Sequence, residues 1–375
     1  MKDNFFVTLV RQESKTLFKL KHSERLWHIP LMAMLATGIP LLTGWYFDNL
    51  QAGLLACLAG LVILYLPSNI PTPQRMVTML VCSFGFMLSF AVGITFSFNL
   101  YLSAVAFGIF TTAVHWLTLY FNTRPPGSFF FIMVASMSSN MPFELATIPT
   151  RLGYVVMGTM FACTLALIYS IIVGKKYNST KRIQLIKPVP IKEQLDYLIR
   201  AVIVGSFMFI ALMVGNLLKF DNPYWIPISC AAIMQGISLY HVWQRALQRI
   251  TGTFIGLALC WILISISDSP LYFCICIMFL QFVIEMFISR NYAVAVIFIT
   301  ALTVLLAEAA NPIITTPNIL IKTRFIDIVI GSLIGGVGGW FLHHEYLRNQ
   351  TRDRLRTTRL QLLKQSRKKR IKQTK

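Results

Sequence analysis

Twelve apolar runs follow one another through this chain, and they restrict its fold more than any other feature. They cover roughly 29–47, 50–66, 77–98, 101–121, 129–141 and 152–173, and then 201–218, 224–240, 250–266, 271–288, 292–307 and 325–343. About 20 apolar residues in a helix cross the roughly 30 Å core of a bilayer. Because a helix satisfies its own backbone hydrogen bonds, the pattern predicts an all-α membrane protein with about twelve transmembrane helices. The fifth run is shorter than a full span needs.

The composition excludes a soluble globular protein. The 375 residues are 56% hydrophobic and 13% charged, and the mean hydropathy is +0.65, which leaves too few polar side chains for a solvated surface. A net charge of +20 would suggest nucleic acid in a soluble chain. No base-stacking or groove-reading motif accompanies that charge, so we expect no nucleic-acid binding. The seven cysteines all fall inside apolar runs, so we expect neither a disulfide framework nor a metal or other cofactor.

The basic residues predict the orientation of the chain in the membrane. With the N-terminus inside, all but four of the 34 Lys and Arg lie on the cytoplasmic side, the exceptions being Arg151, Lys219, Lys322 and Arg324. Lys and Arg are enriched in cytoplasmic loops of membrane proteins. The first 28 residues lack the short apolar core of a signal peptide. We therefore expect a multi-pass protein of the inner (plasma) membrane with both termini in the cytoplasm.

The two sets of six runs resemble each other at an offset of about 173 residues. Asp48-Asn49 matches Asp221-Asn222, Thr150-Arg151 matches Thr323-Arg324, Gly158 matches Gly331, and Arg75 matches Arg249 one residue further on. Since each set has an even number of spans, we expect two parallel six-helix repeats with a pathway between them. The expected organisation is a cytoplasmic segment 1–28, a first repeat 29–173, a basic linker 174–198, a second repeat 199–343 and a basic cytoplasmic tail 344–375.

Arginines near the cytoplasmic helix ends are candidate substrate-binding residues, because a charge that faces a bundle interior is costly unless it is hydrated or paired. Arg249 directly precedes Thr251-Gly252-Thr253, where we expect a helix to begin. The guanidinium, the hydroxyls of Thr251 and Thr253 and free backbone N–H groups would then converge on a carboxylate. Arg245 and the first-half counterpart Arg75 are further candidates. The alternative is that these arginines anchor the chain to lipid phosphates.

Arg151 and Arg324 lie on the expected outer side, where the positive-inside rule gives no reason for them. They either line the outer mouth of the pathway or pair structurally with Glu144 or Asp327. Asn222-Pro223 fits a capping residue followed by proline at the first helical position.

A proton-coupled carrier needs a group that titrates inside the pathway. His115, in the fourth apolar run, and Glu308, near the end of the eleventh, are the candidates. The alternative for His115 is a hydrogen bond to a neighbouring helix.

One stretch of the second half resembles a known family. Trp243-Gln244-Arg245 through Arg249-Ile-Thr-Gly-Thr-Phe-Ile-Gly256, preceded by Asn222-Pro223-Tyr224-Trp225, resembles the second-half signature of the fusaric acid resistance protein family. That group includes the aromatic acid exporters and is distantly similar to plant aluminium-activated malate transporters. Arg290-Asn291-Tyr292 and Thr323-Arg324 followed by Gly331 also fit the pattern, and the resemblance covers about 29–343. Pro73-Gln74-Arg75 is a degenerate first-half copy.

The resemblance implies an inner-membrane exporter of organic anions. Many family members carry a large cytosolic domain, whereas 32 residues follow His343 here. A passive anion channel and a non-transport protein of envelope assembly are the competing functions. No paired carboxylates, Ser-His-acid set or phosphate-binding glycine loop points to an enzyme. We expect as partners a small organic anion, membrane lipids, and either a second copy of the chain or envelope proteins.

Overall fold

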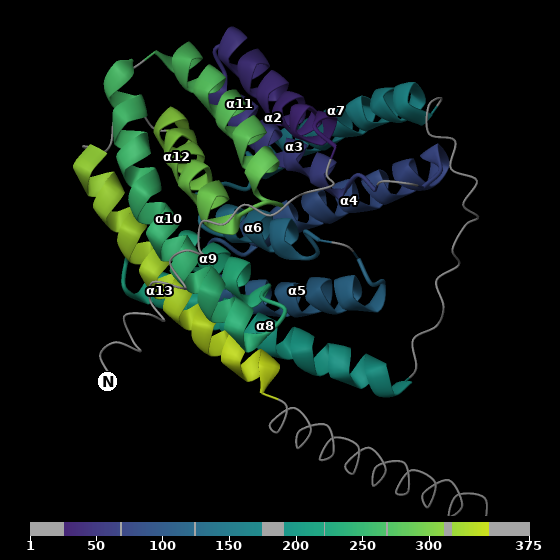
Figure 1. The fold of residues 1–375 in the computed structure, drawn as a ribbon, viewed down its shortest axis with the longest axis vertical. Coiled ribbons are helices and arrows are strands. Elements are labelled where there is room, and N and C mark those ends of the chain that lie inside the picture. The colour runs from purple at the N-terminus through teal and green to yellow at the C-terminus, as the bar shows by residue number, and fades with distance from the viewer. Residues whose placement is uncertain are drawn as a thin grey trace, which may run out of the picture.

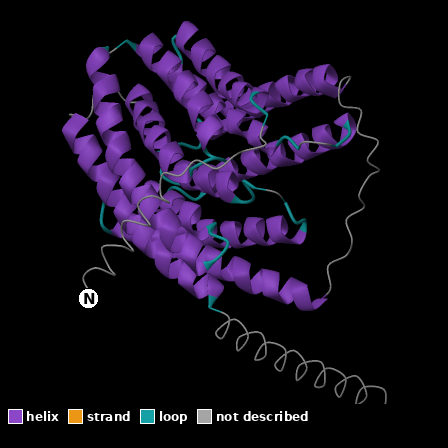
Figure 2. Cartoon of the chain, viewed as in Figure 1, coloured by secondary structure: helices purple, strands orange, loops and turns teal. Residues whose placement is uncertain are grey.

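The computed structural model describes residues 26–67, 70–123, 125–174, 191–220, 222–267, 269–310 and 317–344. Within these ranges the chain forms helices joined by turns and loops, and no strand, as Figure 2 shows. The expected all-α class is confirmed. The N-terminal segment up to residue 25, residues 175–190 of the linker and the tail from residue 345 lie outside the described residues.

Each apolar run contains a helix. The helices are α2 (His28–Tyr46), α3 (Leu50–Gly60) continued by the 3-10 helix η1 (Leu61–Tyr65), α4 (Thr72–Thr95), α5 (Leu100–Tyr120), α6 (Phe129–Ser138), α7 (Ile148–Gly174), α8 (Ile191–Leu217), α9 (Trp225–Met234), α10 (Leu239–Ile266), α11 (Pro270–Phe287), α12 (Tyr292–Ala310) and α13 (Pro317–His343). Among the described residues, eight helices are long and apolar enough to cross a membrane: α2, α4, α5, α7, α8, α10, α11 and α13. The apolar helices α3 with η1, α6, α9 and α12 are shorter.

Several helices begin at other residues than the apolar runs indicate. α8 begins at Ile191, so the last residues of the expected linker 174–198 are helical. Asn49 caps α3 by accepting a hydrogen bond from the Ala52 N–H. The corresponding cap expected at Asn222 is wrong, because α9 begins at Trp225 and its N-terminus carries no side-chain cap bond.

The largest difference concerns α10, which begins at Leu239 and not near Ile250. The Ser238 hydroxyl caps it by accepting a hydrogen bond from the His241 N–H. Charged side chains lower the hydropathy of the first turns and suggested a loop there. In the fold, Arg249 lies on the buried face of this one continuous helix.

The two halves of the chain are interleaved. Within each half the same order of helices packs in the same way: α3 and α4 pack on α7, as α9 and α10 pack on α13, and α4 packs on α6 as α10 packs on α12. Across the halves, α5 packs along α8 and α11 packs along α2, at opposite sides of the bundle in Figure 1. The helix of the fourth apolar run in each half therefore packs along the first helix of the other half.

Two glycines let short helices approach their neighbours closely. A Cβ atom at Gly158 of α7 would overlap the backbone of Ala56 on α3. At Gly331 of α13, the counterpart of Gly158, it would lie 2.5 Å from the Ile226 carbonyl oxygen and 2.7 Å from the Ser229 Cβ on α9. These spacings are too short for any side chain, so the close packing of α3 and α9 depends on glycine at both positions.

Candidate functional site

Helix α9 is short and enclosed by other helices. All ten residues from Trp225 to Met234 are buried. At 1.5 Å per residue the helix is about 15 Å long, roughly half the thickness of a bilayer core. It packs against α13, α8, α6 and α10. Transporters commonly build binding sites at interrupted helices of this kind, because their ends bring polar groups into the membrane interior.

Three arginines contact one face of α9, and we call Arg245, Arg249 and Arg324 the arginine row. Their contacts along the helix are Arg324 with Trp225, Arg249 with Ser229 and Arg245 with Ala232. Positions separated by four and then three residues lie on the same face of a helix. Arg324 comes from α13 and the other two from α10. The fold thus brings together charges that are far apart in the sequence.

Arg324 is only 5% exposed. Its guanidinium carbon lies 3.2 Å from the centre of the Trp225 ring, and its Nη2 donates a 2.9 Å hydrogen bond to the Thr303 hydroxyl of α12. Its buried Nε and Nη1 have no hydrogen-bond partner. A cavity of about 10 Å³ lies beside it, lined by Asn222, Trp225, Thr303, Val304, Thr323, Arg324 and Asp327. This volume holds about one water molecule.

Arg249 is 4% exposed and is bonded to two hydroxyls. Its Nη1 donates to the Tyr292 hydroxyl at 3.1 Å and its Nη2 to the Ser229 hydroxyl at 3.2 Å, while its buried Nε has no hydrogen-bond partner. Arg245 lies over the Tyr292 ring, with its guanidinium carbon 5.3 Å from the ring centre. Tyr292 therefore links the two arginines of α10.

The buried charges of Arg249 and Arg324 are not neutralised by direct ion pairs. In the part of the chain that the structure describes, neither residue forms one. Burying a guanidinium is unfavourable unless its N–H groups are satisfied and its charge is balanced. An anion bound at the arginine row would supply a balancing negative charge and hydrogen-bond acceptors for the N–H groups that have none.

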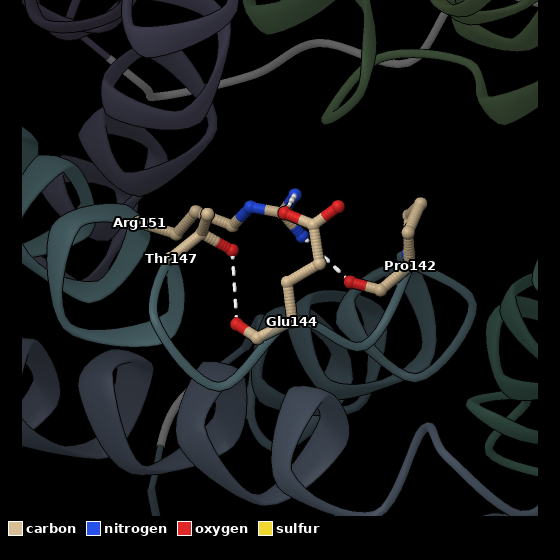
Figure 3. Close-up of polar contacts among 4 residues, drawn as sticks. All are labelled: Pro142, Glu144, Thr147 and Arg151. Atoms are coloured by element: carbon tan, nitrogen blue, oxygen red, sulfur yellow. Dashed lines mark hydrogen bonds and ion pairs between the residues drawn. The ribbon is translucent and has the colours of Figure 1, made fainter.

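The first half has no such row. Arg151, the counterpart of Arg324, donates a 2.9 Å hydrogen bond to the Pro142 carbonyl and lies 4.0 Å from the Glu144 carboxylate. Figure 3 shows the guanidinium between these groups, with Glu144 also accepting a backbone bond from the Thr147 hydroxyl. Of the two alternatives for Arg151, structural pairing with Glu144 is the one observed. Arg75, in the first turn of α4, is 8% exposed, and its buried Nε has no hydrogen-bond partner.

The expected convergence of backbone N–H groups beyond Arg249 is wrong. Since α10 starts at Leu239, the N–H groups after Arg249 lie in the helix interior and not at a free N-terminus. The Thr251 hydroxyl donates to the Leu247 carbonyl at 2.8 Å. Thr253 is buried and accepts a 3.4 Å hydrogen bond from Thr300 of α12. Neither threonine contacts the arginine row.

The proton-coupling candidates are not part of the row either. The Nδ1 atom of His115 lies 2.8 Å from the hydroxyl oxygen of Ser128, the residue just before α6. The side chain of Glu308 lies outside the described residues.

Sequence reasoning missed four residues around the arginine row, namely Ser229, Trp225, Tyr292 and Thr303, and it named Asp327 only as a structural partner. Trp225 and Tyr292 were inside the motifs quoted for the family resemblance, which was the available signal. Ser229 and Thr303 lie within apolar runs, where a hydroxyl usually bonds to its own helix.

A family match falls in the second half of the chain. Residues 210–338 match the family model of fusaric acid resistance protein-like proteins, and this range contains α9, α10 and the whole arginine row. The chain is also 36% identical over 149 residues to the uncharacterized membrane protein YvaC of Bacillus subtilis (strain 168). That match covers 40% of this chain and only 24% of the relative's length. No solved structure matches the chain. Residues 210–338 of this membrane protein are therefore similar to the fusaric acid resistance protein-like family.

Proposed function

We propose that this chain is a transporter that exports aromatic or other organic acids, and that the arginine row binds their carboxylate groups. One observation carries the proposal: Arg249 and Arg324 are 4% and 5% exposed and form no ion pair within the described part of the chain. A carboxylate accepts charge-assisted hydrogen bonds from a guanidinium and neutralises it. Ionisable groups buried in a membrane bundle commonly mark ion pathways.

The position of α9 supports a pathway between two repeats. The Ser136 hydroxyl of α6 donates a 3.0 Å hydrogen bond to the Tyr224 carbonyl just before α9. Met133 of α6 also packs against Trp225. The arginine row therefore lies next to the boundary between the halves. The matching helix contacts in each half, and the exchange of α5 and α11, support two parallel repeats of six helices and about twelve membrane passes.

The cavity beside Arg324 is closed to an organic anion, as the site of a carrier is between its two open states. About 10 Å³ is too small for a carboxylate group. An organic anion can enter only if α9 or α13 moves, and alternate opening and closing around a site is the behaviour of a carrier. The charge distribution supports the inner membrane as the location, with both termini in the cytoplasm. His115 and Glu308 are the sequence-based candidates for proton coupling.

Proteoliposomes containing the purified full chain test the proposal. We expect them to transport labelled benzoate, and Arg249→Ala and Arg324→Ala each to remove most of this flux without loss of folded protein. Arg200→Ala is the control, since Arg200 is an arginine outside the row that is paired with Asp196 on α8. Full transport by both arginine variants would contradict the site.

Electrical recording on the same vesicles separates the carrier from the channel. Currents far above carrier turnover, with no dependence on a pH gradient, would identify a passive channel. A protein that moves no organic anion would favour the envelope-assembly alternative.

A further inference from the structure

A buried carboxylate shares the cavity of Arg324. Asp327 is 1% exposed, and it follows Arg324 by one turn on α13, where residues three apart are neighbours. Both residues line the cavity of about 10 Å³. Arg324 nevertheless forms no direct ion pair in the described structure. Asp327 is thus close to the guanidinium that would bind the anion.

The charged and titratable groups around Asp327 come from several helices. Arg324 is on its own helix, and Tyr224, which precedes α9, interacts electrostatically with both Arg324 and Asp327. Arg249 and Cys260 of α10 lie near enough to act on Arg324. From α12 the cavity receives the Thr303 hydroxyl, and α9 itself has no charged residue. The described charged residues of α8, namely Glu193, Asp196 and Arg200, lie toward its N-terminal end. Asp327 is therefore the acidic group that an anion would meet beside Arg324.

An anion at Arg324 would place a second negative group in this cavity. Arg324 and Asp327 are buried among helices, so solvent screens the two negative groups poorly. Two carboxyl groups that share such a site do not both stay ionised, because their repulsion is relieved when one of them takes a proton. Proton binding and anion binding then favour each other, and the coupling is reciprocal.

We infer that Asp327 takes up one proton from solution when an organic anion binds at Arg324, so that anion and proton occupy the cavity together. This inference rests on the proposed function and adds the coupling ion to it. It assigns proton binding to Asp327, which the sequence suggested only as a structural partner of Arg324. The consequence is a pH-dependent affinity: the anion binds more tightly as pH falls.

Calorimetry on the purified full chain tests this directly, with benzoate as the probe because it stays ionised between about pH 6 and 8. Titrations at one pH in buffers of different ionisation enthalpy give the number of protons bound with each benzoate. We expect about one proton for the wild-type protein. Across the range in which uptake is complete, the affinity should fall about tenfold per pH unit. Asp327→Asn should bind benzoate with no proton uptake and with a pH-independent affinity.

Glu144→Gln is the matched control, because it neutralises the carboxylate beside Arg151 in the first half. It should keep the wild-type proton uptake. Benzoate binding without proton uptake in the wild-type protein, or unchanged uptake in Asp327→Asn, would overturn the inference. The wild-type measurement decides the matter even where Asp327→Asn does not fold. Wild-type protein that binds no benzoate, or binding that survives Arg324→Ala, would instead contradict the proposed function and remove the basis of this inference.

Discussion

The guanidinium carbon of Arg324 lies 3.2 Å from the centre of the Trp225 ring, and this contact joins the start of α9 to α13. A guanidinium over an aromatic ring away from water gains about 2 kcal/mol. The ring also limits where the guanidinium can lie beside the cavity. Trp225 is therefore expected to position the charge that binds the anion.

Replacement of Trp225 tests that role. Trp225→Ala should weaken benzoate binding about 30-fold, the equivalent of about 2 kcal/mol, while Trp225→Phe keeps an aromatic face and should stay within about threefold of wild type. Calorimetric dissociation constants at one pH measure both. Equal affinity in Trp225→Ala and wild type would show that Arg324 is positioned without the ring.

The two repeat-related arginines should behave differently. Arg324→Ala removes a guanidinium that faces the cavity and should abolish measurable benzoate binding. Arg151→Ala removes one that is already bonded to Pro142 and Glu144, so it should leave the affinity within about twofold. Binding assays on both purified variants decide this. Similar losses in the two variants would indicate that the first half also binds the anion.

Gly331 should be needed for the packing of α9. A methyl group at this position would lie 2.5 Å from the Ile226 carbonyl oxygen, so Gly331→Ala must push α13 away from α9. We expect a loss of about 1–3 kcal/mol of stability, seen as a lower midpoint of thermal unfolding in detergent. Gly153→Ala on α7 is the matched control, since nothing lies within 4 Å of its added Cβ. It should be neutral or raise the midpoint, because alanine favours a helix over glycine.

The pH dependence of benzoate binding distinguishes His115 from Asp327 as the residue that binds the coupled proton. His115 is bonded to Ser128 and does not contact the arginine row. His115→Gln should therefore keep the fall in benzoate affinity with rising pH, whereas Asp327→Asn should lose it. Affinities measured at about pH 6, 7 and 8 compare the two. Loss of the pH dependence in His115→Gln alone would assign the coupling to the histidine.

Much of the fold follows from local patterns. Each apolar run contains a helix because a bilayer accepts only segments that satisfy their own backbone, and the bounds of α2 differ from the expected 29–47 by one residue at each end. The start of α10 was missed because the charges of Arg245 and Arg249 suggested a cytoplasmic turn between two helices. Hydropathy averages over all faces of a helix, so it does not show that a charged side chain points inward from a continuous helix.

The sequence alone determined the all-helical class and the correspondence of Gly158 with Gly331, and it singled out Arg249 as a candidate residue. Only the tertiary structure decided which charges act together. Arg151 and Arg324 each follow a threonine in matching sequence contexts, but Glu144 and the Pro142 carbonyl bind the first, while the second lies buried over Trp225 beside Asp327. The electrostatic role of a charge depends on the groups and water within a few ångströms of it. Packing of helices distant in the sequence sets those neighbours, so spacing along the chain does not reveal them.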